Sequence, residues 1–364
     1  MPGDWTDYIG QIIFILFFIM LFTGLNQRIQ MKLWAYDIRS KLSLIKRHVD
    51  ESRSRTEEIL VKLGVKEPSP LISKYMDFFT IEPVSLEPTD IIKRLDHILT
   101  TRERVFKNSL AQVLPDLGKH ERSLIETSLE IVSVLNYIYK IVRHYLLIGE
   151  KYNNWVLLMQ LQFQMPEILR LTETYYKSFN AFINGVPIGD GAGPLVAYRL
   201  IERGRVLSKK VIDDTVVVET WLDDRRLFVV KAEGPGSNVG KPGKVIQKVI
   251  EELNGNVDLV ITVDAALKLE GEETGEIAEG VGAAIGDPGP EKIAIERAAS
   301  TYGIPLRALV VKMSLEDALH PMKKQIYEAV ERCADYILRI IKDSTKPGST
   351  IIVAGIGNTV GVGQ

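Results

Sequence analysis

An uncharged apolar run near the amino terminus constrains this chain more than any other feature. Residues 8–25 read YIGQIIFILFFIMLFTGL and contain no charged side chain. Eighteen residues of helix rise about 27 Å, close to the hydrocarbon thickness of a bilayer. A secretory signal peptide would need a basic start and a small-residue cleavage site, whereas this chain begins MPGDWTD. A buried core helix is the other alternative. We therefore expect residues 1–25 to be a short tail and a single transmembrane helix in the cell membrane.

The charges on the two sides of this run predict its orientation. Asp4 and Asp7 precede the run, whereas six basic residues follow it between positions 28 and 47, opposed there only by Asp37. Basic flanks face the cytoplasm, so we expect the amino terminus outside and everything after Leu25 in the cytoplasm. The basic residues could also touch anionic head groups, or could be ordinary flanking charge. The lone cysteine, Cys333, excludes an intramolecular disulfide and suits a reducing compartment.

The next part of the chain has helical periodicity. Residues 26–66 predict a cytoplasmic helical stalk, in which Ile38, Leu42, Ile45 and Val49 form an apolar stripe suited to pairing with another helix. This stripe would allow a homo-oligomer through the stalk. Residues 67–182 predict an all-helical domain whose main helices cover about 90–114, 121–148 and 153–179, with a kink or break near Pro166.

Residues 183–364 change character and predict an α/β domain. Segments rich in β-branched residues predict strands at 215–221, 226–232, 258–266, 306–313 and 349–355. Helical patterns at 193–203, 244–253, 291–302 and 315–342 alternate with them. This alternation favours a three-layer α/β fold with a mostly parallel, mixed sheet. Ligands of such folds bind beyond the carboxyl ends of the strands.

Several loops should meet at that end of the sheet. Asp264 closes the buried strand DLVITVDAA, where a carboxylate has to be paired, hydrogen-bonded or shifted in pKa. It could also do no more than bind loop amides. The loop 232–244 is not a P-loop, because Gly236 and Gly240 enclose three residues and Pro242 follows Lys241. The acidic, Gly-rich stretch 270–292 predicts a loop with a short strand over the site.

A Gly-rich turn without a preceding strand stands at NGVPIGDGAGPLVAYR, residues 184–199. Conversely, the strand 349–355 continues into GIGN and no helix follows within the sequence. The simplest account is a circular permutation, with the last strand lying in the sheet beside the helix that starts at Gly193. Asp190 would then neighbour Asp264, although it could instead only stabilise the turn.

In the joined order, IIVAGIGN and IGDGAGPLVAYRL resemble the opening of hydrogenase-maturation endopeptidases. The segments PGSNVGKPG, VDLVITVDAAL and GIPLRALVV are similar, in order, to the germination (spore) protease. The resemblance covers residues 184–364 and implies a phosphorylase/hydrolase-like, circularly permuted domain with catalytic Asp190 and Asp264. The whole chain also resembles an uncharacterised family of archaeal membrane-anchored proteins, which implies no activity.

Paired carboxylates suffice for acid–base hydrolysis, since one can activate water while the other, kept protonated, polarises a carbonyl. Glu276 or Glu279 could supply a third acidic group. The sequence requires no cofactor; a divalent metal could bind the pair, but nickel is disfavoured because no histidine lies between His144 and His320. Backbone N–H groups of the Gly-rich loops could bind an oxyanion or phosphate. The candidate binding residues are Gly189, Gly191, Gly193, Gly236, Gly240, Gly355, Gly357 and Asn358.

Three functions are compatible with these features. The first is a membrane-anchored, cytoplasm-facing peptidase-like hydrolase that uses the aspartate pair on a peptide or protein. The second is a catalytically inactive, membrane-tethered binding or scaffold protein. The third is a hydrolase or phosphorylase acting on a non-peptide substrate. The net charge of −2 gives no reason to expect nucleic acid as a partner.

Overall fold

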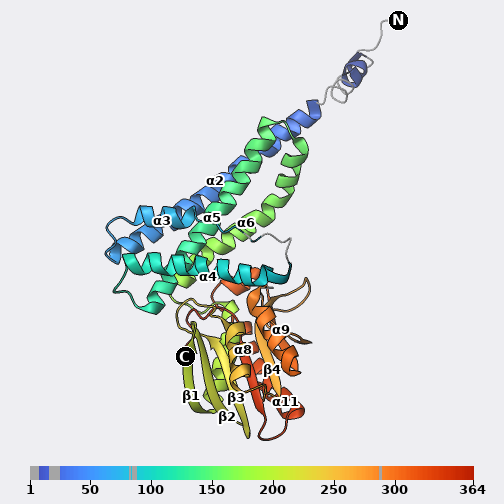
Figure 1. Ribbon diagram of the computed structural model, residues 1–364. Coiled ribbons are helices and arrows are strands. Elements are labelled where there is room, and N and C mark those ends of the chain that lie inside the picture. The colour runs from blue at the N-terminus through green and yellow to red at the C-terminus, as the bar shows by residue number, and fades with distance from the viewer. Residues whose placement is uncertain (1–7, 16–24, 82, 84–87, 287–288) are drawn as a thin grey trace. The chain divides into compact units, whose positions relative to one another are not determined.

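A helical region comes first in the chain and an α/β region follows (Figure 1). The computed structural model describes residues 8–15, 25–81, 83, 88–286 and 289–364. The helical region contains α2 (Leu25–Lys62), α3 (Pro68–Met76), α4 (Pro88–Val113), α5 (Lys119–Lys151) and α6 (Trp155–Ile183). The α/β region contains η1 (Gly189–Gly191), α7 (Ala192–Arg203), β1 (Arg205–Ile212), β2 (Thr215–Leu222), β3 (Arg225–Ala232), α8 (Pro242–Glu252), β4 (Leu259–Leu267), β5 (Ile277–Val281), α9 (Pro290–Tyr302), β6 (Leu306–Met313), α10 (Leu315–Leu319), α11 (Lys324–Ser344) and β7 (Thr350–Gly355).

The chain forms two compact units, which are described separately. The first contains the described residues up to Glu58 together with Ile131–Tyr176. The second contains Ile59–Glu130, as far as it is described, and the described residues from Lys177 onwards. The helices α2, α5 and α6 therefore contribute to both units.

The core of the first unit is a contact between three helices. The buried side chains are Ala35, Ile38, Leu42 and Ile45 of α2, Val142 and Leu146 of α5, and Leu158, Leu161 and Met165 of α6. Burial of this apolar surface favours the helical packing, because each large aliphatic side chain removed from water contributes about 1.5–3 kcal/mol. The stripe on α2 is thus covered by helices of the same chain, so an oligomer through the stalk would need another surface.

Seven strands form one mixed sheet in the order β1-β2-β3-β7-β4-β6-β5. The central strands β3, β7, β4 and β6 are parallel to one another. The outer pairs, β1 with β2, β2 with β3, and β5 with β6, are antiparallel. The last strand in chain order, β7, lies between β3 and β4. The mixed sheet confirms the α/β class predicted for this part of the chain.

Helices cover both faces of the sheet (Figure 1). Successive strand residues point to opposite faces, so Val229 and Val353 pack with α7 and α11, whereas Val230 and Ile352 pack with α8 and α9. This two-sided burial explains the nearly continuous apolar runs of the central strands. Cys333 of α11 is buried in the first of these cores, as expected.

Three local features differ from the predictions. The strand β1 was not predicted, because most of its residues are exposed and its sequence RVLSKKVI includes two adjacent lysines. The single helix predicted over 315–342 is two helices, α10 and α11, since Pro321 lies between them and His320 ends the first. Of the kink or break predicted near Pro166, the break does not occur, because α6 continues through this residue.

The Gly-rich turn before α7 and the last strand lie side by side. A Cβ atom added to Gly193 would come within 2.2 Å of the Ile356 carbonyl oxygen and 2.6 Å of the Val263 carbonyl oxygen. A Cβ atom on Gly355 would come within 2.2 Å of the Gly193 carbonyl oxygen. Helix and strand therefore meet through their backbones, which only glycine permits at these two positions.

The apolar run 8–25 is described only in part. Residues 8–15 are helical, and their large apolar side chains are more than half exposed. Residues 16–24 lie outside the described residues. Within the part of the chain that the structure describes, α5 is the one helix that is long and apolar enough to cross a membrane. The same helix contributes Val142 and Leu146 to the core of the first unit, and core helices can be equally long and apolar.

We predict that Gly193→Ala destabilises the chain by about 3 kcal/mol, because a methyl group there would collide with two backbone carbonyls that cannot both move. Unfolding of the full-length chain in detergent, followed by circular dichroism, measures the effect. The matched control is Gly280→Ala on β5, where an added Cβ meets nothing within 4 Å and a change below about 0.5 kcal/mol is expected. Equal stability of the two variants would contradict the contact.

Candidate functional site

Asp264 lies at the carboxyl end of β4, in the parallel centre of the sheet. Its side chain is only 6% exposed. Its Oδ1 atom accepts a hydrogen bond from the Ala265 N–H at 2.7 Å, and the Gly286 N–H also donates to this carboxyl group. Two residues earlier on the same strand, Thr262 Oγ1 accepts a hydrogen bond from the Ala284 N–H at 2.7 Å. The segment after β5 is thus attached to the end of β4 at two points.

Asp190 reaches the same edge of the sheet from η1. Its Oδ2 atom accepts a hydrogen bond from the Asn358 N–H at 2.8 Å. Asn358 follows β7, which is the direct neighbour of β4. The Ile356 N–H, two residues earlier, donates to the Val263 carbonyl next to Asp264 at 2.7 Å. The structure therefore brings Asp190, Asp264 and Asn358 together.

Burial favours the protonated state of both aspartates, and the charge of Asp190 favours it further for Asp264. Burial, followed by the negative charge of Asp190, raises the pKa of Asp264 to about 7, although two N–H donors oppose the shift. Burial likewise raises the pKa of Asp190, and the Asn358 N–H opposes it. Two adjacent carboxyl groups that resist double ionisation share a proton over part of the pH range. Such a pair can act as acid and base together.

The glycines around Asp190 are required by close backbone contacts. Gly357 has a φ angle of 129°, and a Cβ atom on it would lie 2.1 Å from the Asp190 carbonyl oxygen. A Cβ atom on Gly189 would lie 2.2 Å from the Asp317 carbonyl oxygen, and one on Gly191 would lie 3.1 Å from that of Asn358. These three glycines allow the close backbone contacts that position the Asp190 loop. The ligand binding predicted for them would be a second role.

The loop with Gly236 and Gly240 has a different local role. The Gly240 N–H donates to Asn238 Oδ1 at 3.0 Å, and the Lys241 N–H donates to Thr215 Oγ1 at 2.7 Å. Gly236 packs directly against the start of α5. Since these two N–H groups already have partners within the chain, they are not open to an anion in this structure.

The two candidate third acidic groups are engaged in ion pairs. Glu276 contacts Lys312 at 2.8 Å. Glu279 contacts Arg307 at 3.2 Å and accepts a hydrogen bond from Tyr336 of α11 at 2.6 Å. Val263, the residue before Asp264 on β4, packs on the face of the sheet that α11 covers. Because successive side chains of a strand point to opposite faces, the Asp264 side chain lies on the other face. Glu279 therefore does not join the aspartate pair.

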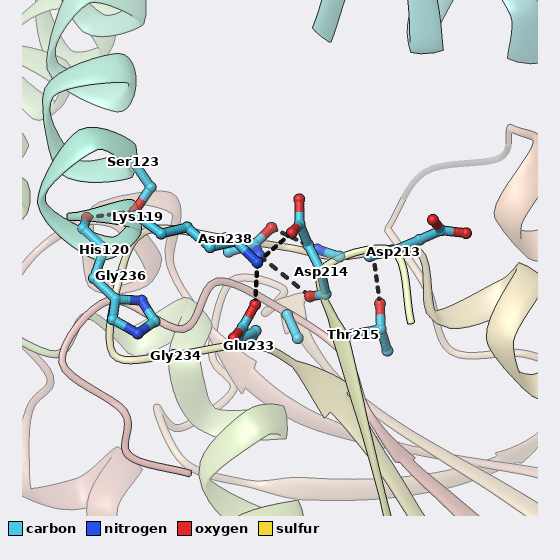
Figure 2. A network of polar contacts seen from close by, with 12 residues as sticks. Lys119, His120, Ser123, Asp213, Asp214, Thr215, Glu233, Gly234, Gly236 and Asn238 are labelled. Atoms are coloured by element: carbon cyan, nitrogen blue, oxygen red, sulfur yellow. Dashed lines mark hydrogen bonds and ion pairs between the residues drawn. The ribbon is translucent and has the colours of Figure 1, made fainter. Parts of the chain in front are cut away.

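A network of ion pairs links α4 and α5 to the loops beside the site. Lys119 of α5 lies between Asp214 and Glu233, with 2.6 Å to the Asp214 carboxylate (Figure 2). Lys107 of α4 contacts Asp214 from the other side at 2.5 Å. Burial alone would raise the pKa of Asp214, but hydrogen bonds from both lysines hold it below its ordinary value. The network keeps its buried charges paired.

A cavity of about 270 Å³ adjoins this network. Ser237 forms part of its wall, and the Ser237 Oγ atom lies 2.8 Å from Thr127 Oγ1 and 3.0 Å from Asn358 Nδ2. Because the Asn358 backbone N–H binds Asp190, one residue connects the aspartate pair to the cavity wall. Hydrogen bonds therefore connect the cavity wall at Ser237 to Asp190 through Asn358.

Lys231 is a second functional candidate that sequence reasoning did not single out. It lies at the carboxyl end of β3, opposite Gly355 of β7, and is 0% exposed. Its Nζ atom donates to the Gly363 carbonyl at 2.7 Å, and burial lowers its pKa to about 8. Lys231 thereby fixes the segment that follows Asn358. A lysine near the end of the predicted strand RLFVVKA was the available signal.

Metal-binding residues do not cluster in the described structure. Among the residues that it describes, no group of three or more His, Cys, Asp or Glu side chains could hold a metal ion. Asp190 and Asp264 alone provide two carboxylates, which is fewer protein ligands than metal sites usually have.

The fold and the site define an α/β protein with a buried aspartate pair at the carboxyl edge of its sheet, preceded by a helical region. The chain belongs to the DUF1512 family. Residues 12–185 match the family's model described as "Protein of unknown function (DUF1512) N-terminal domain", and residues 188–363 match "Domain of unknown function (DUF1512) C-terminal". No curated protein and no solved structure matches the chain. The boundary between the two matches falls between α6 and η1.

We predict that Asp264→Asn changes how the stability of the chain depends on pH. Folded Asp264 binds its proton more tightly than the unfolded chain does, so its stabilising contribution is complete below about pH 4 and is lost as the pH rises through about 7. Between pH 5 and pH 8 the wild type should therefore lose about 2–3 kcal/mol of unfolding free energy relative to the variant. Urea unfolding at both pH values measures this difference.

Asp258→Asn provides the control for this prediction, because Asp258 lies at the opposite end of β4, where it accepts a hydrogen bond from the Thr350 N–H. This variant should keep the pH dependence of the wild type. Parallel pH profiles for the wild type and Asp264→Asn would show that Asp264 is ionised in the folded chain throughout this range.

Proposed function

We propose that this protein is a hydrolase in which Asp190 and Asp264 act together on a carbonyl group. The observation that carries the proposal is the meeting of the buried Asp264 carboxyl group with the half-buried Asp190 carboxyl group from a separate segment. Burial raises both pKa values, and the charge of Asp190 raises that of Asp264 further. Perturbed carboxyl groups paired at the carboxyl edge of a parallel sheet are typical of functional sites.

The chemistry needs one proton shared between the two aspartates. The ionised carboxylate takes a proton from water as the water oxygen attacks the carbonyl carbon of the substrate. The protonated carboxyl group donates a hydrogen bond to the carbonyl oxygen and stabilises its developing negative charge. Collapse of the tetrahedral intermediate breaks the C–N bond, and the proton taken from water passes to the leaving amine. Neither a nucleophilic side chain nor a cofactor takes part in these steps.

A peptide or protein is the proposed substrate. The support is the resemblance of residues 184–364 to hydrogenase-maturation endopeptidases and the germination (spore) protease. The proposal includes a circular permutation: the strand that opens the domain in those families stands at the end of this chain. The contact between α7 and β7 supports it, because the two halves of the motif are neighbours in space although the sequence separates them. A non-peptide carbonyl compound would suit the same pair.

The hydrolase is proposed to be anchored in the cell membrane by residues 8–25. The uncharged run and the excess of basic residues after it support a single pass with the amino terminus outside. Its substrates would then be cytoplasmic and would be held near the membrane surface.

A catalytically inactive binding protein is the second candidate, and one observation favours it. Asp264 is only 6% exposed, and both aspartates already accept backbone N–H groups that tie loops together. In that case the pair would hold the end of the sheet together, and the cavity beside Ser237 would receive a partner's side chain.

We predict that purified full-length protein cleaves members of a peptide library and that Asp190→Asn and Asp264→Asn each lower the rate by at least about 100-fold. The loss follows because an amide can neither take a proton from water nor share one with its neighbour. Mass spectrometry of the products identifies and quantifies the cleavage.

Asp258→Asn is the matched control and should retain the full rate. Cleavage that persists in Asp264→Asn would rule out the aspartate pair. Absence of cleavage by the wild type, together with a stable bound partner that the Asp190 and Asp264 variants still recover, would favour the binding protein.

A further inference from the structure

The first unit contains a large cavity at the start of α2. Its volume is about 940 Å³, and its walls are the first turns of α2 and the turn that joins α5 to α6. Figure 1 shows this turn beside the beginning of α2. Three basic residues, Arg28, Lys32 and Arg39, line the cavity together with the aromatic residues Tyr36 and Trp155.

The cavity has an excess of positive charge. Arg39 pairs with Glu150 at 2.5 Å, and Glu150 is the acidic residue in the cavity wall. Arg28 and Lys32 form no ion pair with any residue that the structure describes. They are four residues apart and hence on one face of α2, where both are exposed. Two positive charges therefore remain available to an anionic ligand.

The depth of these charges matches the headgroup layer of a bilayer. The apolar run ends at Leu25, and a helix rises about 1.5 Å per residue, so Arg28 and Lys32 lie about 5 Å and about 10 Å further along. The headgroup layer adds about 5–8 Å on each side of the hydrocarbon, and a lysine side chain can extend back towards it.

We propose that this cavity binds the headgroup of an anionic phospholipid from the membrane in which the chain is anchored. The Arg28 guanidinium and the Lys32 ammonium donate charge-assisted hydrogen bonds to the phosphate oxygens. The rings of Tyr36 and Trp155 form part of the cavity wall beside these two basic residues. The inference rests on the anchoring part of the proposed function and does not depend on hydrolysis.

The test uses lipid-free full-length protein in a neutral detergent, titrated with phosphatidylglycerol or with phosphatidylcholine. Native mass spectrometry counts the bound lipids. We expect one saturable phosphatidylglycerol site that binds at least about tenfold more tightly than phosphatidylcholine does. The double variant Arg28→Gln/Lys32→Gln should weaken phosphatidylglycerol binding by about 10- to 30-fold and remove the preference.

The control variant Arg47→Gln/Lys62→Gln removes the same charge from exposed positions of α2 outside the cavity and should bind like the wild type. An equal loss in the control would overturn the proposal, since general surface charge would then explain the binding. Retained preference in Arg28→Gln/Lys32→Gln would overturn it as well. Displacement of the lipid by an equal concentration of inorganic phosphate would assign the cavity to a free anion instead.

Separate measurements keep this inference apart from the proposed function. Extraction of membranes with alkaline carbonate tests the anchor, and wild-type protein that is released would overturn both the anchor and the lipid site. Protein that stays in the membrane without a lipid preference would overturn the lipid site alone. Asp264→Asn should bind phosphatidylglycerol like the wild type, and Arg28→Gln/Lys32→Gln should retain the peptide cleavage rate.

Discussion

The α/β domain depends on a contact between two stretches of backbone, at Gly193 in α7 and at Gly355, the last residue of β7, with the following Ile356. Without side chains at the two glycines, the helix approaches the centre of the sheet closely enough for η1 to reach the end of β7. That approach places the Asp190 carboxylate on the Asn358 N–H and beside Asp264. A side chain in this contact would move the helix away and separate the two acids.

Burial is the main cause of the raised pKa values of Asp190 and Asp264. A carboxylate removed from water has to be neutralised or hydrogen-bonded, and here each acid receives only one or two backbone N–H donors and no cation among the described residues. The network around Lys119 behaves oppositely, since its acids and lysines neutralise one another. The second compact unit thus contains charges that are paired for stability and a pair of acids left without a counter-charge among the described residues. The latter arrangement costs stability and is therefore the better candidate for function.

The sequence was sufficient for features that depend on local pattern. Apolar runs predicted the central strands, and the aspartate and glycine positions at their ends predicted which loops meet. It was not sufficient where a residue's role depends on distant partners. Strand β1 looks polar because it lies at the sheet edge, and Lys231 is explained only by the Gly363 carbonyl. Lys119 and Asp214 are 95 positions apart, so no spacing rule could join them.

The position of β7 has a consequence for how the domain is made. The neighbours β3 and β4 have no pairing with each other, and each pairs with β7, which emerges from the ribosome after both. Until then the apolar edges of β3 and β4 stay open, and the sheet exists as two incomplete pieces. If residues 8–25 enter a membrane early in synthesis, the incomplete sheet remains near the membrane surface until β7 is made. During this time its unpaired strand edges are accessible to chaperones and to one another.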